Sequence, residues 1–271
     1  MKKLTAIILS VLMVLSVGGL VVYVFHQKTV NGGEAPVIAF ASDVLEVPTT
    51  ATEEDLLQGV TATDAEDGDV TDSILIEGVT RFVSDNTVKV TYAAFDSQSH
   101  VTKATRSVRY TDYTSPRFTL SGPLVFTESG VADLLQRVGA QDCIDGDLSG
   151  RVKVSSKDNG SLVSSIGSHA VEFRVTNSMG DTAYLTATVD VVNSNANSAQ
   201  ITLSSYLVYL AQGEEFNPGA YVTSFVRGDK TYTNTADGVA IDSNVDPATP
   251  GTYEVNYTVD NSYTRLIVVV E

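Results

Sequence analysis

A two-part pattern occurs twice in the chain and restricts its fold more than any other feature. Asp-Leu-Leu-Gln at residues 55–58 is followed by Asp-Ala-Glu-Asp-Gly-Asp at residues 64–69. The same tetrapeptide stands at residues 133–136, and Asp-Cys-Ile-Asp-Gly-Asp stands at residues 142–147. Both parts therefore recur 78 positions later, from 55 to 133 and from 64 to 142. Because two separate segments share one offset, the sequence indicates a tandem repeat about as long as a small domain.

Each repeat contains segments with the two-residue periodicity of a β-strand. In residues 88–95, buried-type side chains alternate with Lys89, Thr91 and Ala93, and residues 171–175 alternate in the same way. In the closing strand of the second repeat, Ala183, Leu185, Ala187, Val189 and Val191 are expected on the core side. Such alternation is typical of a strand with one buried and one solvated face. Turn-forming residues separate these segments, which predicts an all-β chain of β-sandwich domains in series.

One short helix is predicted ahead of each acidic segment. Thr52 is followed three residues later by Asp55, and acidic residues fill the first turn, which is a helix-start signal. We therefore expect a single helical turn over residues 52–57 and an equivalent turn around Asp133.

The N-terminus carries a long stretch without charge. After Met1-Lys2-Lys3, residues 4–25 contain no charged side chain, and a helix of that length is about 33 Å long. This length favours an uncleaved transmembrane signal anchor over a cleaved signal peptide, whose weak cleavage site would be residues 16–18. With Lys2 and Lys3 before the span, the N-terminus is expected in the cytoplasm and the remainder outside the cell. The predicted location is the cell membrane, as a single-pass protein, or the medium if the signal is cleaved.

These signals divide the chain into five segments. Residues 4–25 are the predicted anchor, and residues 26–35 are a polar tether. Residues 36–113 and 114–193 are the first and second predicted domains. Residues 198–271 are a divergent third domain, which has the closing hairpin but no acidic loop and which follows an Asn- and Ser-rich linker.

The composition excludes some partners. The chain has 33 acidic and 17 basic side chains, for a net charge of −16. Such a surface repels phosphate, so nucleic acid is not an expected partner. The single cysteine, Cys143, excludes an intrachain disulfide and is interpreted as a buried, small apolar side chain.

The acidic loop of the first repeat is the candidate binding site, because calcium prefers carboxylate oxygens. The candidate calcium ligands are Asp64, Glu66, Asp67, Asp69 and Asp72. Their spacing does not fit an EF-hand, and Glu66 and Asp72 are matched by Ile144 and Gly150 in the second repeat. The preferred interpretation is a turn, in which Asp side chains accept backbone hydrogen bonds and Gly68 takes a positive φ. Calcium is the alternative, and no other cofactor is expected.

The order of these features resembles a known group of domains. Val-x-Ala-x-Asp-x-x-Asp-Gly-Asp-Val-Thr at residues 60–71, then an alternating strand, Asp96-Ser97 and a closing strand, is similar to bacterial immunoglobulin-like surface domains. The nearest group is the Ig-like module family also found in an insecticidal crystal protein. The second repeat matches as well, and the third is similar at residues 218–221, 250–253 and its closing hairpin. The resemblance implies tandem Ig-like β-sandwich domains behind a transmembrane helix, on a bacterial cell surface, and carries no catalytic residue.

No residue pattern predicts catalysis. His26, His100 and His169 lie in the tether or in turns, without a nucleophile pattern beside them. We therefore expect a non-catalytic, membrane-anchored surface protein whose modules act as a stalk or interaction scaffold, with an extracellular protein or a glycan as its unidentified partner. One alternative is an adhesin or carbohydrate-binding protein with the third domain as its tip, and another is a set of calcium-stiffened modules. Seven of the twelve tyrosines lie in the third domain, so exposed tyrosines there favour the adhesin and buried ones oppose it.

Overall fold

The structure is a computed structural model that describes residues 33–127, 131–157, 165–193 and 201–271, together with the helical positions Ser16, Gly19, Leu20 and Val22. The regular secondary structure of the described part is almost entirely β-strand, as the sequence predicts. It divides into two compact units, Met1–Asp112 and Tyr113–Glu271.

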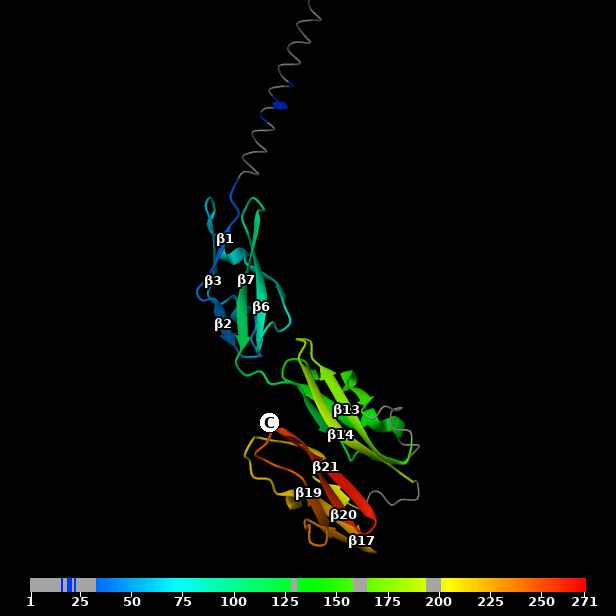
Figure 1. The fold of residues 1–271 in the computed structure, drawn as a ribbon. Helices are drawn as coiled ribbons and strands as arrows, with labels where there is room; N and C mark the ends of the chain where they lie inside the picture. Colours follow the sequence, from blue (N-terminus) through cyan, green and yellow to red (C-terminus); the bar gives the residue numbers. More distant parts are fainter. Residues whose placement is uncertain are drawn as a thin grey trace, which may run out of the picture. The chain divides into compact units, whose positions relative to one another are not determined.

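The first unit contains one three-stranded and one four-stranded sheet (Figure 1). The three-stranded sheet has the order β1-β3-β4, formed by Val37–Phe40, Val60–Asp64 and Gly68–Asp69. The four-stranded sheet has the order β2-β7-β6-β5, formed by Val44–Val47, Val101–Tyr110, Thr87–Phe95 and Leu75–Val79. Strand β2 runs parallel to β7, and the other pairs are antiparallel. We call strands β1 to β7 the first module.

The second unit contains this arrangement twice. The small sheet of the second module has the order β11-β10-β8, formed by Gly146–Asp147, Val138–Asp142 and Arg117–Leu120. Its large sheet has the order β12-β13-β14-β9, formed by Lys153–Ser156, Gly167–Thr176, Thr182–Val192 and Val125–Thr127. The small sheet of the third module has the order β15-β17-β18, formed by Ile201–Leu203, Val222–Arg227 and Lys230–Thr233. Its large sheet has the order β16-β21-β20-β19, formed by Leu207–Leu210, Ser262–Val270, Gly251–Val259 and Ala240–Ser243. The third module thus has the strand order of the other two, although its sequence has diverged.

The helical turns lie where the sequence places them. Helix α2 covers Glu53–Leu57, and Thr52 and Asp55 form a capping box at its start. The equivalent segments are the 3-10 turns η2 (Val131–Gln136) and η4 (Pro218–Tyr221). A second turn, η1 (Thr71–Ser73) in the first module and η3 (Ser149–Arg151) in the second, leads from the three-stranded sheet toward the four-stranded one.

The alternating strands place their apolar side chains in the module cores. Strand β6 buries Val88, Val90, Tyr92 and Ala94, all at 0 % exposure. Strand β14 buries Leu185, Ala187, Val189 and Val191 in the same way, as the periodicity predicts. Two core tyrosines use their hydroxyls to hold the helical turns: Tyr92 donates to the carbonyl of Leu56 and Tyr257 to the carbonyl of Pro218.

One charged side chain lies in the core of the first module. Arg106, on the inward face of β7, is only 3 % exposed. Its guanidinium donates to the carbonyl oxygens of Ser42 and Gln58 at 2.9 and 2.7 Å and to the Ser42 hydroxyl at 2.7 Å. These bonds satisfy the buried charge without a carboxylate.

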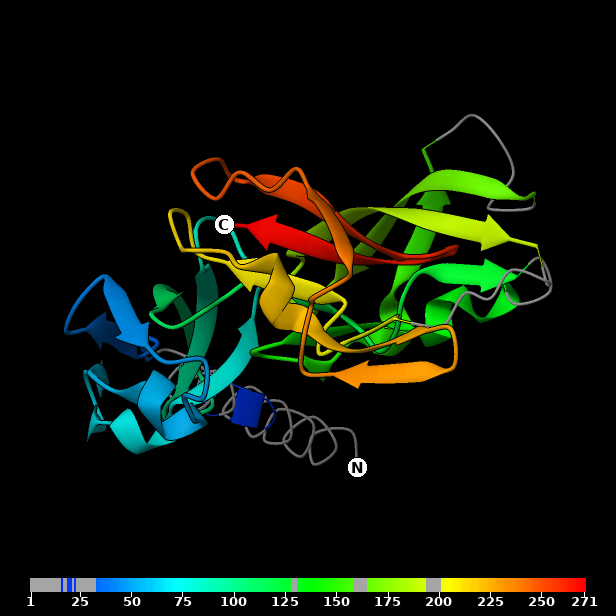
Figure 2. The same ribbon diagram turned by 90° about the horizontal axis from the view of Figure 1, so that it is seen from below.

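The second and third modules pack against each other. The sequence predicts them as domains in series and does not predict this contact between them. Leu207 and Ile267 of the third module belong to the buried core cluster of the second. The backbone N–H of Phe118 donates to the Tyr209 hydroxyl at 2.8 Å. Figures 1 and 2 show strand β21, in red, beside the yellow-green strand β14. The two modules therefore form one compact unit.

A polar network on β14, β20 and β21 joins the same two modules. Nη1 of Arg265 lies 3.2 Å from Oδ2 of Asp190 in an ion pair, and its Nε lies 3.4 Å from Oε2 of Glu254. Glu254 also accepts hydrogen bonds from the backbone N–H and the hydroxyl of Thr188. Asp190 is 2 % exposed, because the third module covers the outer face of β14.

Several predicted segments fall outside the described residues. The predicted anchor, residues 4–25, is described only at Ser16, Gly19, Leu20 and Val22, and most of the tether and of the linker near residues 194–200 is not described. Within the described part of the chain, no helix combines the length and the apolar character needed to cross a membrane.

Candidate functional site

The acidic loop of each of the first two modules is a tight turn between the second and third strands of the small sheet. Oδ1 of Asp64 accepts hydrogen bonds from the backbone N–H groups of Glu66 and Asp67, both at 2.8 Å. Asp142 does the same with Ile144 and Asp145, at 2.9 and 2.8 Å. These are the side-chain-to-backbone bonds of an Asx turn.

Glycine completes this turn in both modules. Gly68 has a φ of 76° and Gly146 a φ of 71°, a left-handed conformation that side-chain-bearing residues rarely adopt. The conserved geometry of the two copies supports the turn interpretation of the Asp-Gly-Asp motif.

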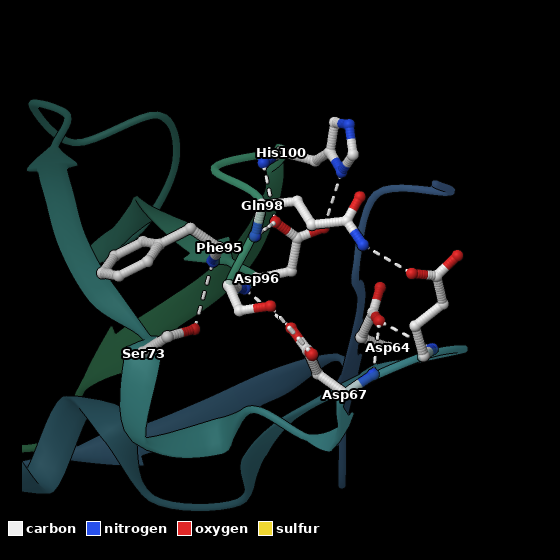
Figure 3. Close-up of polar contacts among 9 residues, drawn as sticks. Asp64, Asp67, Ser73, Phe95, Asp96, Gln98 and His100 are labelled. Atoms are coloured by element: carbon white, nitrogen blue, oxygen red, sulfur yellow. Dashed lines mark hydrogen bonds and ion pairs between the residues drawn. The ribbon is translucent and has the colours of Figure 1, made fainter. Parts of the chain in front are cut away.

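The middle aspartate of the motif connects the acidic turn to the hairpin between the two longest strands. In the first module, the Asp67 carboxylate accepts from the Ser97 backbone N–H at 2.7 Å and from its hydroxyl at 3.0 Å (Figure 3). In the second module, Asp145 binds Ser178 in the same way, at 2.7 and 2.6 Å. We call each pair the carboxylate clamp, because it ties the small sheet to the large one.

Hydrogen bonds to the clamp favour the ionised carboxylate. The Ser178 hydroxyl and backbone N–H, with Arg151 at 2.9 Å, hold the pKa of Asp145 below its ordinary value. The last aspartate of each motif behaves similarly, since Thr71 and Ser149 lower the pKa values of Asp69 and Asp147 through side-chain and backbone hydrogen bonds.

The five candidate calcium ligands do not gather around one point. Asp64, Asp67 and Asp69 bind the turn, the Ser97 hairpin and Thr71 respectively. Glu66 is exposed beside the Gln98 amide, and Asp72 is exposed in η1. Among the residues that the structure describes, no three His, Cys, Asp or Glu side chains form a group that could hold a metal ion. Calcium binding at these residues stays a prediction.

The two hairpins differ in the residue that faces the first aspartate of the motif. In the second module, Nδ2 of Asn177 donates to Oδ2 of Asp142 at 3.1 Å and to the Tyr113 hydroxyl at 2.8 Å. Tyr113 donates in turn to Asp181 at 2.7 Å. Burial and the charge of Asp181 raise the pKa of the Tyr113 phenol.

The first module has Asp96 at the position of Asn177. Oδ1 of Asp96 accepts from the backbone N–H groups of Gln98 and His100, and Oδ2 lies 2.7 Å from Nδ1 of His100 (Figure 3). Burial opposes ionisation of Asp96, but its hydrogen bonds with His100 and Gln98 outweigh burial and lower its pKa. Oδ2 of Asp64, which has no amide donor here, is buried without a hydrogen-bond partner among the described residues.

Two other sequence interpretations are resolved by the structure. Cys143 is exposed, so its assignment to a core was wrong. It stands at the tip of the acidic turn, where Sγ lies 3.3 Å from the carbonyl oxygen of Thr114. His169 lies in strand β13, so its assignment to a turn was wrong, and its Nε2 lies 2.7 Å from the carbonyl oxygen of Ser165. His26 lies outside the described residues.

The tyrosines of the third module are largely packed inside it. Tyr257 is fully buried, and Tyr206, Tyr209, Tyr221, Tyr253 and Tyr263 are half-buried. Tyr232, at 37 % exposure, stacks on Phe225 with ring centroids 4.8 Å apart. The third module therefore lacks, in its described residues, the exposed tyrosine patch that a binding tip would need. The most exposed described tyrosine is Tyr184 of the second module, at 59 %.

Comparison with known proteins gives few relatives by sequence. No family model matches the chain. A stretch of 149 residues, 51 % of the chain, is 34 % identical to an uncharacterised 81.3 kDa protein of Acholeplasma phage L2. The match covers 19 % of that protein, so the chain spans about a fifth of the relative's length.

Solved structures similar to the chain are strand-rich proteins with several domains. The chain matches the CBM51-2 and INT domains of ZmpB from Clostridium perfringens at 15 % identity and a TM-score of 0.24, over 87 % of the chain and 42 % of that structure. It also matches the S-layer protein SbsC (13 %, TM-score 0.21, 88 % and 41 %) and a lipoprotein of Bacteroides thetaiotaomicron (15 %, TM-score 0.22, 86 % and 98 %). All three TM-scores lie well below 0.5.

Proposed function

We propose that the protein is a membrane-anchored bacterial cell-surface protein whose Ig-like modules serve as a non-catalytic stalk or interaction scaffold. The carboxylate clamp carries this proposal. The Asp-Gly-Asp motif connects the small sheet to the large one in both modules. The carboxylate oxygens of Asp67 and Asp145 accept hydrogen bonds from Ser97 and Ser178 and so take part in the fold itself. A scaffold needs such rigid modules, whereas an active site needs polar groups that are available to a substrate.

The packing of the second and third modules supports the same role. A shared apolar cluster and the Asp190–Arg265–Glu254 network hold the two sandwiches as one unit. Contacts of this kind oppose bending between modules, which suits a part that presents a surface at a distance from the membrane. The anchor itself is inferred from the uncharged residues 4–25 and the two preceding lysines.

Fractionation of cells that express the full chain with a C-terminal epitope tag tests the location. We expect the tag in the membrane fraction and its removal by protease added to intact cells. Leu12→Arg/Leu15→Arg places two charges in the predicted span and should abolish membrane retention, because each charge at the centre of a span costs about 2.5–3.5 kcal/mol. Leu12→Ala/Leu15→Ala, which stays uncharged, is the matched control and should behave as the wild type. A wild-type protein found in the cytosol and protected from protease would contradict the proposal.

A further inference from the structure

A row of basic and aromatic side chains crosses the outer face of the large sheet in the second module. Lys153 on β12 lies directly opposite Arg174 on β13, and Arg174 lies directly opposite Tyr184 on β14. All three are exposed, and they alternate with the buried Phe173, Val175 and Leu185. They therefore share one face of three neighbouring strands, of which β13 and β14 are labelled in Figure 1.

The two cations of this row have no acidic partner. Neither Lys153 nor Arg174 forms an ion pair with any residue that the structure describes, whereas Arg151 pairs with Asp145 and Lys157 with Glu172. Like charges directly opposite each other on adjacent strands destabilise a sheet. The pair is therefore a cost to the fold, and an anion bound between the two side chains would remove that cost.

A hollow of about 390 Å³ lies at the end of the row. It is lined by Gly150, Arg151, Lys153, Arg174 and Thr176. The Thr176 hydroxyl pairs with that of Thr182 at 2.8 Å on the same face. The hollow thus combines two unpaired cations with the Thr176 hydroxyl group, and Tyr184 lies on the neighbouring strand.

The fold does not require these residue types at this position. The corresponding rows are Leu75, Ala93 and Lys103 in the first module and Ala240, Thr258 and Tyr263 in the third. Because three modules with the same strand order carry three different rows, the basic row belongs to the second module alone. That module is also the least acidic, with nine acidic and six basic residues in residues 114–193.

We propose that this face of the second module binds an acidic saccharide, a sugar chain with isolated carboxylate or sulfate groups. Lys153 and Arg174, about 5 Å apart at Cβ in such a pair, hold one anionic group between them by charge-assisted hydrogen bonds. The exposed ring of Tyr184 packs on the apolar face of an adjoining sugar, and the threonine hydroxyls bond its hydroxyl groups. The Arg151–Asp145 pair, at 2.9 Å, borders the site and adds no net charge.

The sparse charge of the face selects this ligand over a nucleic acid. A nucleic acid strand carries one phosphate about every 3.4 Å and needs a continuous basic track, whereas this row offers two free cations on a chain of net charge −16. Repulsion by the distant acidic groups is screened beyond about 8 Å at physiological ionic strength. A saccharide with one charge per sugar can therefore bind the two local cations, and it is repelled less by the acidic surface than a polyanion of high charge density.

Binding to the full chain in detergent micelles tests the proposal. The acidic probes are hexagalacturonate and a heparin hexasaccharide, and the controls are the methyl ester of hexagalacturonate, which has the same sugars without charge, and hexaglutamate, which has the charge without sugars. We expect calorimetry to show binding of at least one acidic saccharide, weakened by salt, and at least tenfold weaker binding of both controls. The proposal would be overturned if neither acidic saccharide bound more tightly than the two controls. Preferential binding of hexaglutamate would identify an acidic-peptide surface instead.

Two variants with matched controls locate the site. Lys153→Gln/Arg174→Gln should weaken binding about tenfold or more, because it removes charge-assisted bonds. Lys103→Gln/Arg109→Gln removes the same charge from the first module and should leave binding unchanged. Tyr184→Thr, which keeps a strand-forming residue, should weaken binding about three- to tenfold, and Tyr232→Thr is its control. Equal effects of variants and controls would overturn the assignment of this face. Surface location is not needed for binding, so this experiment and the fractionation experiment can fail separately.

Discussion

Removing the Arg265 charge tests whether the second and third modules act as one unit. Arg265→Met keeps the apolar stem but leaves Asp190 without its cation. The Asp190 side chain is 3 % exposed and that of Arg265 is 15 % exposed, so the pair is screened little by water. Loss of one partner of a buried ion pair costs about 3–5 kcal/mol, because the remaining charge stays buried. The second unit, Tyr113–Glu271, has roughly 160 residues, and for that size each 1 kcal/mol lowers Tm by about 2–4 °C.

We therefore expect Arg265→Met to lower the melting temperature of the second unit by about 6–20 °C. Differential scanning calorimetry of the full chain in detergent should show this shift in one transition, while the transition of the first unit stays in place. Hydrogen-exchange mass spectrometry assigns each transition to its unit. Arg109→Met is the control, since Arg109 and Glu46 form a pair that is more than half exposed and such pairs contribute about 0–1 kcal/mol.

A double variant separates the buried charge from general disruption. Asp190→Asn/Arg265→Met removes both charges, so it should recover part of the stability lost in Arg265→Met. Ser168 and Leu124 provide the remaining bonds to residue 190, at 2.5 Å to its carboxylate and 2.9 Å from its backbone N–H. If Arg265→Met shifts the transition no more than Arg109→Met, or if the double variant is less stable than the single one, the network does not join the modules as argued.

Four further predictions concern the modules themselves. Asp145→Ala breaks the carboxylate clamp and should destabilise the second unit by about 1–3 kcal/mol in urea denaturation, whereas the exposed Asp229→Ala should have little effect. The folded-state pKa of Asp145 is lowered from 3.8, so its ionised form contributes stability that is complete well above pH 3.8 and is lost as the pH falls through the lowered pKa. Asp145→Asn should therefore lose less stability than the wild type between pH 5 and 2. Parallel profiles of stability against pH for the two proteins would contradict this assignment. Tyr92→Phe removes the hydroxyl bound to Leu56 and should cost about 1 kcal/mol in the first unit, with no effect on the second, where Phe173 occupies the equivalent position without a hydroxyl. Calcium at millimolar concentration should leave both melting transitions in place, because Asp64 and Asp67 are engaged by the turn and the hairpin and the five candidate ligands do not gather around one point. A rise in melting temperature that Asp64→Asn abolishes would establish the calcium site.

The local structure of the modules can be predicted from residues that lie close together in the chain. Thr52 and Asp55 predict the capped turn, and the Asp-Gly-Asp motif predicts an Asx turn with glycine at positive φ. Both predictions succeed because each turn is formed by residues only a few positions apart. Alternation on β6 and β14 identified the core side chains, since a strand buries every second residue. The carboxylate clamp could be predicted only in part: both copies retain the aspartate, but its partners, Ser97 and Ser178, are 30 and 33 residues away.

The elements that cover the outer faces of the sheets depend on tertiary packing and cannot be predicted from the local sequence. Alternation placed Asp190 on the solvent side of β14, yet the third module buries it against Arg265. The same pattern could not identify the carbonyl partners of Arg106 at Ser42 and Gln58, or the row that Lys153, Arg174 and Tyr184 form. Periodicity reports which face of a strand turns toward its own core. The neighbour on the other face comes from distant parts of the chain, and its position depends on strand register and module packing, which no local pattern encodes.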